Sequence, residues 1–306
     1  MTEEETTKKV AKMSSMPNEI LLYIFAYCDM DSLVNMKMTN KANLSRVHEI
    51  LRRKTEFRAG DRLQFMDGMH ANCSLAAQKI LRFMRLMPNL RRVSFVDIPA
   101  RITLPELIAM NLHNPYIRHI EFVQNQFNFI ERDAFLGLRY MRNLRSLKIV
   151  NWNPMHVVRR GCSSRIETIP AEILQDLKVF EIAGDGETVE NIFSFMEQYS
   201  VYMERIITLK VHVRITTSRV SSLIFRFIMR HPHLKEIAFN GLLFDTQSQV
   251  QEFYSMLMVN PQLRILDIEN CAVVERLENT ISRNFVERLY ENGVQLVGQV
   301  KSLRHI

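Results

Sequence analysis

The chain has 306 residues, of which 47% are hydrophobic and 24% are charged, and its formal net charge is +7. This composition is ordinary for a folded protein, and nine glycines and nine prolines are too few for low-complexity, collagen-like or hairpin-rich chains. No apolar run reaches the roughly 20 residues that a membrane-spanning helix needs. The start of the chain also lacks the apolar core of a signal peptide. We therefore expect a cytoplasmic or nuclear protein that contacts no membrane.

The cysteines are too far apart in the sequence to form a Cys-x-x-Cys metal pair. We expect Cys28, Cys73, Cys162 and Cys271 to be free thiols in a reducing compartment, and we predict no metal site. No GxSxG, HExxH, GxGxxG or P-loop motif occurs, so no catalytic residue and no cofactor is predicted.

The basic residues are spread along the chain in small clusters without interleaved aromatic residues. Examples are Arg52–Lys54, Arg91–Arg92 and Arg159–Arg160. Each cluster is predicted to be a solvated face, because base-stacking surfaces combine basic and aromatic side chains. Nucleic acid is therefore not the expected partner.

In chain order, residues 1–13 are predicted to be a disordered tail, and residues 14–54 a short all-α module. Pro17 suits the first turn of a helix, where its missing N–H costs nothing, and Glu19 suits the positive end of that helix. Asp31 or Ser32 is predicted to cap a second helix. About 40 residues form a small core, so this module is expected to pack against the rest of the chain or a partner.

After a predicted linker at residues 55–73, one pattern recurs: apolar, two variable, apolar, one variable, apolar. Its seven copies begin 27, 27, 33, 29, 28 and 29 residues apart, and chance matches would not keep so constant a period. The copies are LRRVSF from Leu90, IRHIEF from Ile117, LRSLKI from Leu144, LKVFEI from Leu177, IITLKV from Ile206, LKEIAF from Leu234 and LRILDI from Leu263.

A run with apolar residues three and four positions apart precedes most copies, which predicts a helix buried on one face. Several runs end near a proline, which cannot continue a helix. His231 and His233 flank one of these prolines and are predicted to be surface turn residues rather than metal ligands. The predicted helical runs are 74–87, 104–114, 131–143, 188–200, 218–230 and 248–260.

The repeating strand–helix unit matches the leucine-rich repeat. We predict an α/β fold in which residues 74–306 form a leucine-rich-repeat solenoid with a C-terminal cap. Parallel strands line its concave side and helices its convex side. The longest interval is predicted to hold an insertion at residues 154–167. A mixed α/β domain without repeats is the alternative.

Side chains alternate along a strand, so the variable positions between the apolar anchors are predicted to face the concave side and bind a protein substrate. Three valines there predict an apolar patch, and three carboxylates predict an acidic cluster for a basic segment. Covered valines and a solvated acidic surface are the alternatives. The predicted substrate residues are Arg92, Val96, His119, Glu121, Val123, Lys148, Val150, Lys210, Glu236, Asp267 and Glu269.

The segment MPNEILLYIFAYCDMDSLVNMKMTNKAN, from Met16, resembles the F-box, which opens with Leu-Pro-x-Glu, continues with aliphatic residues and has an Asp-x-x-Leu second helix. Met16 replaces the usual leucine, and the tryptophan common near the end of the motif is absent, with Ala42 and Asn43 in that region. Together with the repeats, the chain resembles the divergent F-box and leucine-rich-repeat proteins abundant in nematodes.

The resemblance implies a non-catalytic substrate-recognition adaptor of an SCF-type E3 ubiquitin ligase. The F-box would bind a Skp-type adaptor, and through it cullin and RING subunits, while the repeats would hold a protein substrate. Two alternatives stay open: an F-box scaffold that acts without degradation, in translational or developmental regulation, and a nucleic-acid-binding solenoid. The implied adaptor-binding residues are Met16, Pro17, Glu19, Ile20, Ile24, Phe25, Leu33 and Met36.

Overall fold

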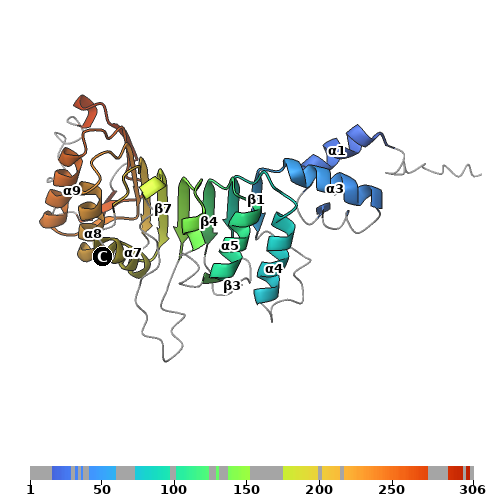
Figure 1. Cartoon of the computed structure of the whole chain (residues 1–306). Helices are drawn as coiled ribbons and strands as arrows, with labels where there is room; N and C mark the ends of the chain where they lie inside the picture. The colour runs from blue at the N-terminus through green and yellow to red at the C-terminus, as the bar shows by residue number, and fades with distance from the viewer. Residues whose placement is uncertain are drawn as a thin grey trace, which may run out of the picture.

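The computed structural model describes residues 16–28, 32–33, 36, 41–59, 73–96, 101–123, 129–130, 137–151, 175–198, 202–213, 217–274, 289–298 and 301–303. The predicted tail at residues 1–13 and the predicted insertion at residues 154–167 lie outside this part of the chain. The main feature of the described residues is a parallel sheet of nine strands, in the order β1-β2-β4-β6-β7-β8-β9-β11-β13. Figure 1 shows these strands side by side along the length of the molecule.

Seven strands of this sheet, all but β1 and β13, coincide with the predicted repeat copies. In β4, β6 and β7 fully buried side chains alternate with half-buried ones, because every second residue faces the hydrophobic core. The strands are β1 (Glu56–Ala59), β2 (Arg92–Phe95), β4 (His119–Val123), β6 (Ser146–Val150), β7 (Val179–Gly184), β8 (Thr208–Val213), β9 (Glu236–Asn240), β11 (Ile265–Asp267) and β13 (Gln295–Val297).

The register of the sheet places equivalent residues of successive repeats beside one another. Lys148 of β6, for example, pairs with Glu121 of β4 and with Glu181 of β7. The same alignment holds at every step from β2 to β11. The predicted repeat is therefore confirmed as a stack of parallel strands.

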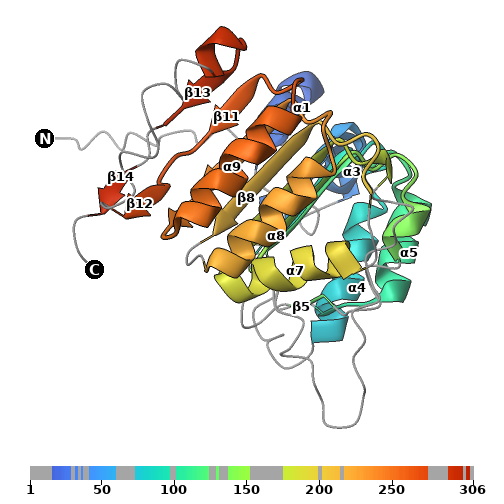
Figure 2. The same ribbon diagram turned by 90° about the vertical axis from the view of Figure 1, so that its left-hand side faces the viewer.

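The helices lie along one face of this sheet, as Figures 1 and 2 show, and leave the opposite face, here called the open face, without a helical layer in the described chain. Threonines cap the first turns of two of these helices: the Thr217 hydroxyl accepts the Val220 N–H, and Thr246 forms a capping box with Gln249. The helices are α4 (Cys73–Met84), α5 (Leu104–His113), α7 (Gly186–Gln198), α8 (Ser218–Met229) and α9 (Gln247–Val259).

Five of the six predicted helical runs are confirmed. The sixth, at residues 131–143, is wrong in its described part, where residues 137–140 form a single 3₁₀ turn. A side chain at Gly137 would bring its Cβ within 2.7 Å of the Leu107 Cβ on α5, so this segment packs too closely for an ordinary helical layer.

Short strands between the main strands and the helices form two further parallel sheets. One has the order β10-β12-β14 and the other pairs β3 with β5. Their bounds are β3 (Arg101–Ile102), β5 (Phe129–Ile130), β10 (Leu243–Phe244), β12 (Ala272–Val274) and β14 (Lys301–Leu303).

One predicted domain boundary needs correction. Residues 55–73 were expected to be a linker, but Glu56–Ala59 form β1, which pairs in parallel with β2. Phe57 of β1 is buried in the core, which explains why this segment joins the sheet. At the other end, β13 adds a further parallel strand beside β11, so part of the predicted cap continues the main sheet.

The N-terminal module consists, in its described part, of α1 (Asn18–Tyr27), residues 32–33 and 36, and α3 (Lys41–Arg53). It lies at the β1 end of the array (Figure 1). Leu21 and Phe25 of α1 are buried in the same continuous core as Val47 and Leu51 of α3. The Asn89 side-chain amide donates to the Arg52 carbonyl oxygen at 2.7 Å and ties the end of α3 to the turn before β2.

Polar side chains close the turns that lead into the strands. The buried Asn114 amide donates to the carbonyl oxygens of Met84 and Met87, at 3.1 and 2.8 Å. His231 plays the same part later in the array: its Nδ1 lies 2.7 Å from the Phe227 carbonyl oxygen, and its Nε2 accepts the Met203 N–H at 2.9 Å. The prediction of a surface turn residue is wrong for His231, because its ring is fully buried and links the end of its own helix to Met203 of the neighbouring repeat.

Candidate interaction surfaces

One face of α1 exposes four large apolar side chains. Ile20 is 51% exposed, Tyr23 67%, Ile24 38% and Tyr27 75%. Their spacing of three and four residues places them on a single side of the helix. The two tyrosine rings pack edge to face at 5.1 Å, and the Tyr27 hydroxyl donates to the Tyr23 oxygen at 3.1 Å. We call these four residues the α1 stripe.

The stripe exists because α1 is apolar on both sides. Leu21 and Phe25 bury one side against α3, which leaves the other side exposed. A helix that is hydrophobic all round is normally buried all round. Exposed apolar patches on otherwise polar surfaces mark interaction sites. The stripe is therefore a candidate docking surface.

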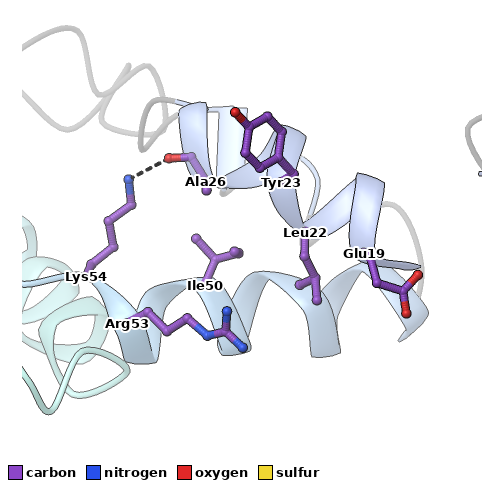
Figure 3. Close-up of a pocket in the computed structure, with 7 residues that line it drawn as sticks. All are labelled: Glu19, Leu22, Tyr23, Ala26, Ile50, Arg53 and Lys54. Carbon is purple, nitrogen blue, oxygen red and sulfur yellow. Dashed lines mark hydrogen bonds between the residues drawn. The ribbon is translucent and has the colours of Figure 1, made fainter. Parts of the chain in front are cut away.

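A groove of about 500 Å³ lies between α1 and α3, next to the stripe. Figure 3 shows Tyr23 on α1, Leu22 pointing from α1 toward α3 and Ile50 pointing from α3 toward α1, while Lys54 reaches from the end of α3 to Ala26 of α1. The Lys54 amine donates to the Ala26 carbonyl oxygen at 3.2 Å and closes one end. The groove is lined by Glu19, Leu22, Tyr23, Ala26, Ile50, Arg53 and Lys54.

The structure separates the predicted adaptor-binding residues into exposed and buried groups. Ile20 and Ile24 belong to the stripe, Pro17 and Glu19 are exposed, and Met16 and Met36 are half-buried. Phe25 and Leu33 are fully buried in the core of the chain, so their placement on a partner-facing surface is wrong. Both side chains instead belong to the hydrophobic core that holds the N-terminal module together. Tyr23 and Tyr27 were missing from the predicted set, although their spacing from Ile20 would have identified them.

The open face of the sheet carries a row of alternating charges across five strands. Lys148 lies 3.2 Å from Glu121 and 2.9 Å from Glu181, and Lys210 lies 2.9 Å from Glu236. His212 approaches the same Glu181 carboxylate at 3.6 Å. We call Glu121, Lys148, Glu181, Lys210 and Glu236 the charge ladder. Its charges pair with one another, so this part of the face offers a partner few free charges.

The pKa values at the first step of the ladder reflect this pairing. Burial acts to raise the pKa of Glu121, but hydrogen bonds from Ser94 and Lys148 and the charges of Lys148 and Arg58 outweigh it and lower that pKa. Burial acts to lower the pKa of Lys148, but Glu181 and Glu121 outweigh it and raise that pKa. Both groups therefore stay charged at neutral pH.

His119 lies at the β2–β4 end of the open face, beside Arg92 in register. Burial lowers its pKa, and the charges of Arg92 and Arg118 lower it further. Arg92 is itself largely exposed and lies 3.8 Å from Glu56 of β1.

The predicted valine patch is only partly present. Val123 and Val150 pair in register and are half-buried, but Val96 is 8% exposed and is not available to a partner. The strand β2 ends at Phe95, so the alternation of a strand no longer governs the direction of Val96.

The predicted acidic cluster is not brought together as one site. Both oxygens of Glu236 are engaged, one by Lys210 and the other by the Thr208 hydroxyl at 3.1 Å. Asp267 lies beside Ala238 in register and accepts the backbone N–H of Glu269 at 3.0 Å. Glu181, which is central to the charge ladder, was not in the predicted set. Glu181 occupies the same position in its repeat as Lys148 does, and this equivalence could have placed it on the same face.

The thiols and possible metal ligands show no reactive grouping in the described chain. The Cys28 thiol donates to the Ile24 carbonyl oxygen and the Cys271 thiol to the Phe239 carbonyl oxygen, each at 3.5 Å, and Cys162 lies outside the described residues. Burial raises the pKa of the Cys271 thiol to about 12. The described residues contain no group of three potential metal-binding side chains. They also contain no helix that is long and apolar enough to span a membrane.

No protein-family model and no curated protein sequence matches this chain. Among solved structures, the chain is similar to a protein from Bacteroides fragilis, with 11% identity and a TM-score of 0.44, over 78% of this chain and 69% of that one. It is also similar to an internalin from Listeria monocytogenes, with 12% identity and a TM-score of 0.33, over 90% and 91% of the two chains. The assignment of this chain to the class of strand–helix repeat solenoids rests on its own period and strand register.

Proposed function

We propose that this protein is a non-catalytic substrate receptor of an SCF-type ubiquitin ligase. In this proposal the α1 stripe docks on a Skp-type adaptor, and the repeat array holds a protein substrate. The α1 stripe is the observation that supports this proposal most directly. An F-box-like segment presents Ile20, Tyr23, Ile24 and Tyr27 to solvent while its other side is buried. Aromatic and aliphatic side chains of this kind are the usual anchors of protein interfaces.

Docking also explains the two-sided apolar character of α1. Burying a fully exposed isoleucine side chain contributes about 1.5–3 kcal/mol. Ile20 and Ile24 are 51% and 38% exposed, so docking of each contributes about half of that range or less. The i, i+3, i+4 and i+7 spacing of the stripe is that of the anchors of a helix bound in a groove. The groove between α1 and α3 adjoins the stripe and extends the apolar surface past Tyr23.

The test is binding of the full chain to a purified Skp-type adaptor. Ile24→Asp is expected to abolish binding, because it places a charge in the centre of the stripe. The matched control is Leu112→Asp, which makes the same kind of change at a 72% exposed residue of α5, away from the stripe. If the unchanged chain does not bind the adaptor, or if both variants lose binding equally, the proposal is wrong.

The role in degradation is tested in cells. Proteins captured by the array are expected to be more abundant when Ile24→Asp replaces the unchanged chain, because they are held without being passed to the ligase. Equal abundance with the two chains would favour the scaffold function without degradation.

A further inference from the structure

Six basic side chains form a row along the edge of the main sheet at which the strands begin. Each is the residue immediately before a strand of the main sheet. Successive members are joined by backbone hydrogen bonds: Arg118 N–H donates to the Arg91 carbonyl oxygen at 2.7 Å, and Arg145 N–H to the Arg118 carbonyl oxygen at 2.8 Å. The same ladder continues through the rest of the row. This basic row consists of Arg91, Arg118, Arg145, Lys178, Lys235 and Arg264.

The row is continuous over four strands and then interrupted once. Arg91, Arg118, Arg145 and Lys178 precede β2, β4, β6 and β7, and Ile207 occupies the equivalent place before β8. Lys235 and Arg264 resume the row before β9 and β11. Since neighbouring strands lie about 4.8 Å apart, the whole row spans roughly 29 Å.

These cations are available to bind an external anion, and only Arg145 and Arg264 also donate from their guanidinium groups to backbone carbonyl oxygens in the described chain. Five of them are exposed, and Arg145 is half-buried. None of the six forms an ion pair with a carboxylate of the described residues. In contrast, the lysines of the open face are neutralised by the charge ladder. Aligned unpaired cations raise the local potential and attract an extended polyanion.

The width of the row favours an acidic peptide over a nucleic acid. The residues before the cations are buried anchors such as Leu90 and Ile117, and the neighbouring open face carries the carboxylates Glu121, Glu181 and Glu236. An extended peptide is narrow enough to follow a row one side chain wide. A nucleic acid strand is broader and would reach the charge ladder, whose three carboxylates outnumber its two lysines and which therefore offers no net positive charge to phosphates. Tyr116 lies two residues before Arg118 and is 58% exposed, so it can contact apolar side chains within the peptide.

We infer that the basic row binds an extended acidic segment of a partner protein, about nine residues long at roughly 3.3 Å per residue. This inference rests on the proposed function in one respect: it takes the acidic segment to belong to the protein that the array recruits. The binding itself requires no adaptor, so the two proposals fail separately.

The test uses the purified full chain and fluorescence anisotropy of labelled probes. The acidic probe is a ten-residue peptide of alternating glutamate and serine. Its neutral counterpart replaces glutamate with glutamine, and a ten-nucleotide oligothymidine represents nucleic acid. We expect the acidic peptide to bind, the neutral peptide not to bind, and the affinity to fall as salt is raised, because exposed charges are screened.

Charge reversal in the row is expected to weaken binding by roughly tenfold for Arg118→Glu, and further for the pair Arg118→Glu with Lys178→Glu. The matched control, Arg82→Glu, changes the net charge equally at an exposed residue of α4 outside the row, and is expected to leave the affinity within about twofold. Circular dichroism verifies folding, and Arg118→Gln replaces any reversal that does not fold.

Three results would overturn the inference. The first is no binding of the acidic peptide at low salt, and the second is equal weakening by Arg118→Glu and Arg82→Glu. The third is tighter binding of the oligothymidine than of the acidic peptide, with loss in Arg118→Glu, which would assign the row to nucleic acid. Adaptor binding measured on the same variants separates these results from failure of the proposed function.

Discussion

Replacing His231 with glutamine is expected to remove a specific part of the acid sensitivity of this fold. Burial is the main cause that lowers the pKa of His231 to about 4; the hydrogen bond to the Phe227 carbonyl oxygen opposes it, and the charges of His233 and Arg230 add to it. The ring is therefore neutral in the folded protein at neutral pH. Nε2 accepts the Met203 N–H, so Nδ1 carries the proton and donates to Phe227.

The sign and size of the effect follow from the two pKa values. The unfolded chain, with the ordinary pKa of 6.5, takes up the proton first as the pH falls. The stability contributed by His231 is thus fully present above about pH 6.5 and is lost as the pH falls toward 4. For pKa values of 6.5 and about 4, the loss between pH 7 and pH 5 is about 2 kcal/mol.

The assay is urea unfolding at pH 7 and pH 5, followed by circular dichroism, for the unchanged chain and His231→Gln. At pH 7 the variant is expected to be less stable by about 1–3 kcal/mol, because a flexible glutamine amide does not reproduce both hydrogen bonds of the rigid ring, to the Phe227 carbonyl oxygen and from the Met203 N–H. Between pH 7 and 5 the unchanged chain should lose about 2 kcal/mol more than the variant. An equal loss in both, or a His231 ring signal that titrates near pH 6.5 in nuclear magnetic resonance, would refute the reasoning.

Three further changes test the packing and the charges of the array. Phe225→Ala should cost about 3–5 kcal/mol of unfolding free energy, because this buried ring packs against three other phenylalanines; a loss below 1 kcal/mol would contradict that packing. Gly241→Ala should destabilise the protein more than Gly293→Ala. Both glycines have positive φ, but only at Gly241 would a Cβ lie 1.9 Å from the Val213 carbonyl oxygen. The opposite order of the two melting temperatures would contradict this packing. Lys148→Met should cost about 1 kcal/mol or less, because the ladder is partly exposed, and a much larger loss would show that the ladder is a main source of stability.

The repeat period was sufficient to predict most of the fold. The anchors of each copy, such as Leu147 and Phe180, are fully buried, and the copies align in the predicted register. The reason is that each copy exposes the same apolar face, which is buried only when equivalent positions stack. The strand β1 was missed because its segment follows the N-terminal module directly and lacks the complete pattern.

The surfaces were less predictable, since they depend on which side chains meet across the sheet and between helices. Ile24 and Phe25 are neighbours in the same apolar helix, yet one is exposed and the other is buried, because only one side of α1 packs on α3. The sequence predicted that Glu236 is a carboxylate available to a basic partner, but Lys210 from the adjacent strand neutralises it.

The sequence by itself determined a repeating strand–helix chain with an apolar helical segment before the repeats, because period and residue pattern are properties of the sequence alone. The tertiary structure decided which charges are used within the fold and which are available. Basic residues that are dispersed in the sequence, from Arg91 to Arg264, are brought into one row because each occupies the same place in its repeat. The alternating charges on the open face were likewise paired only when the strands lay side by side.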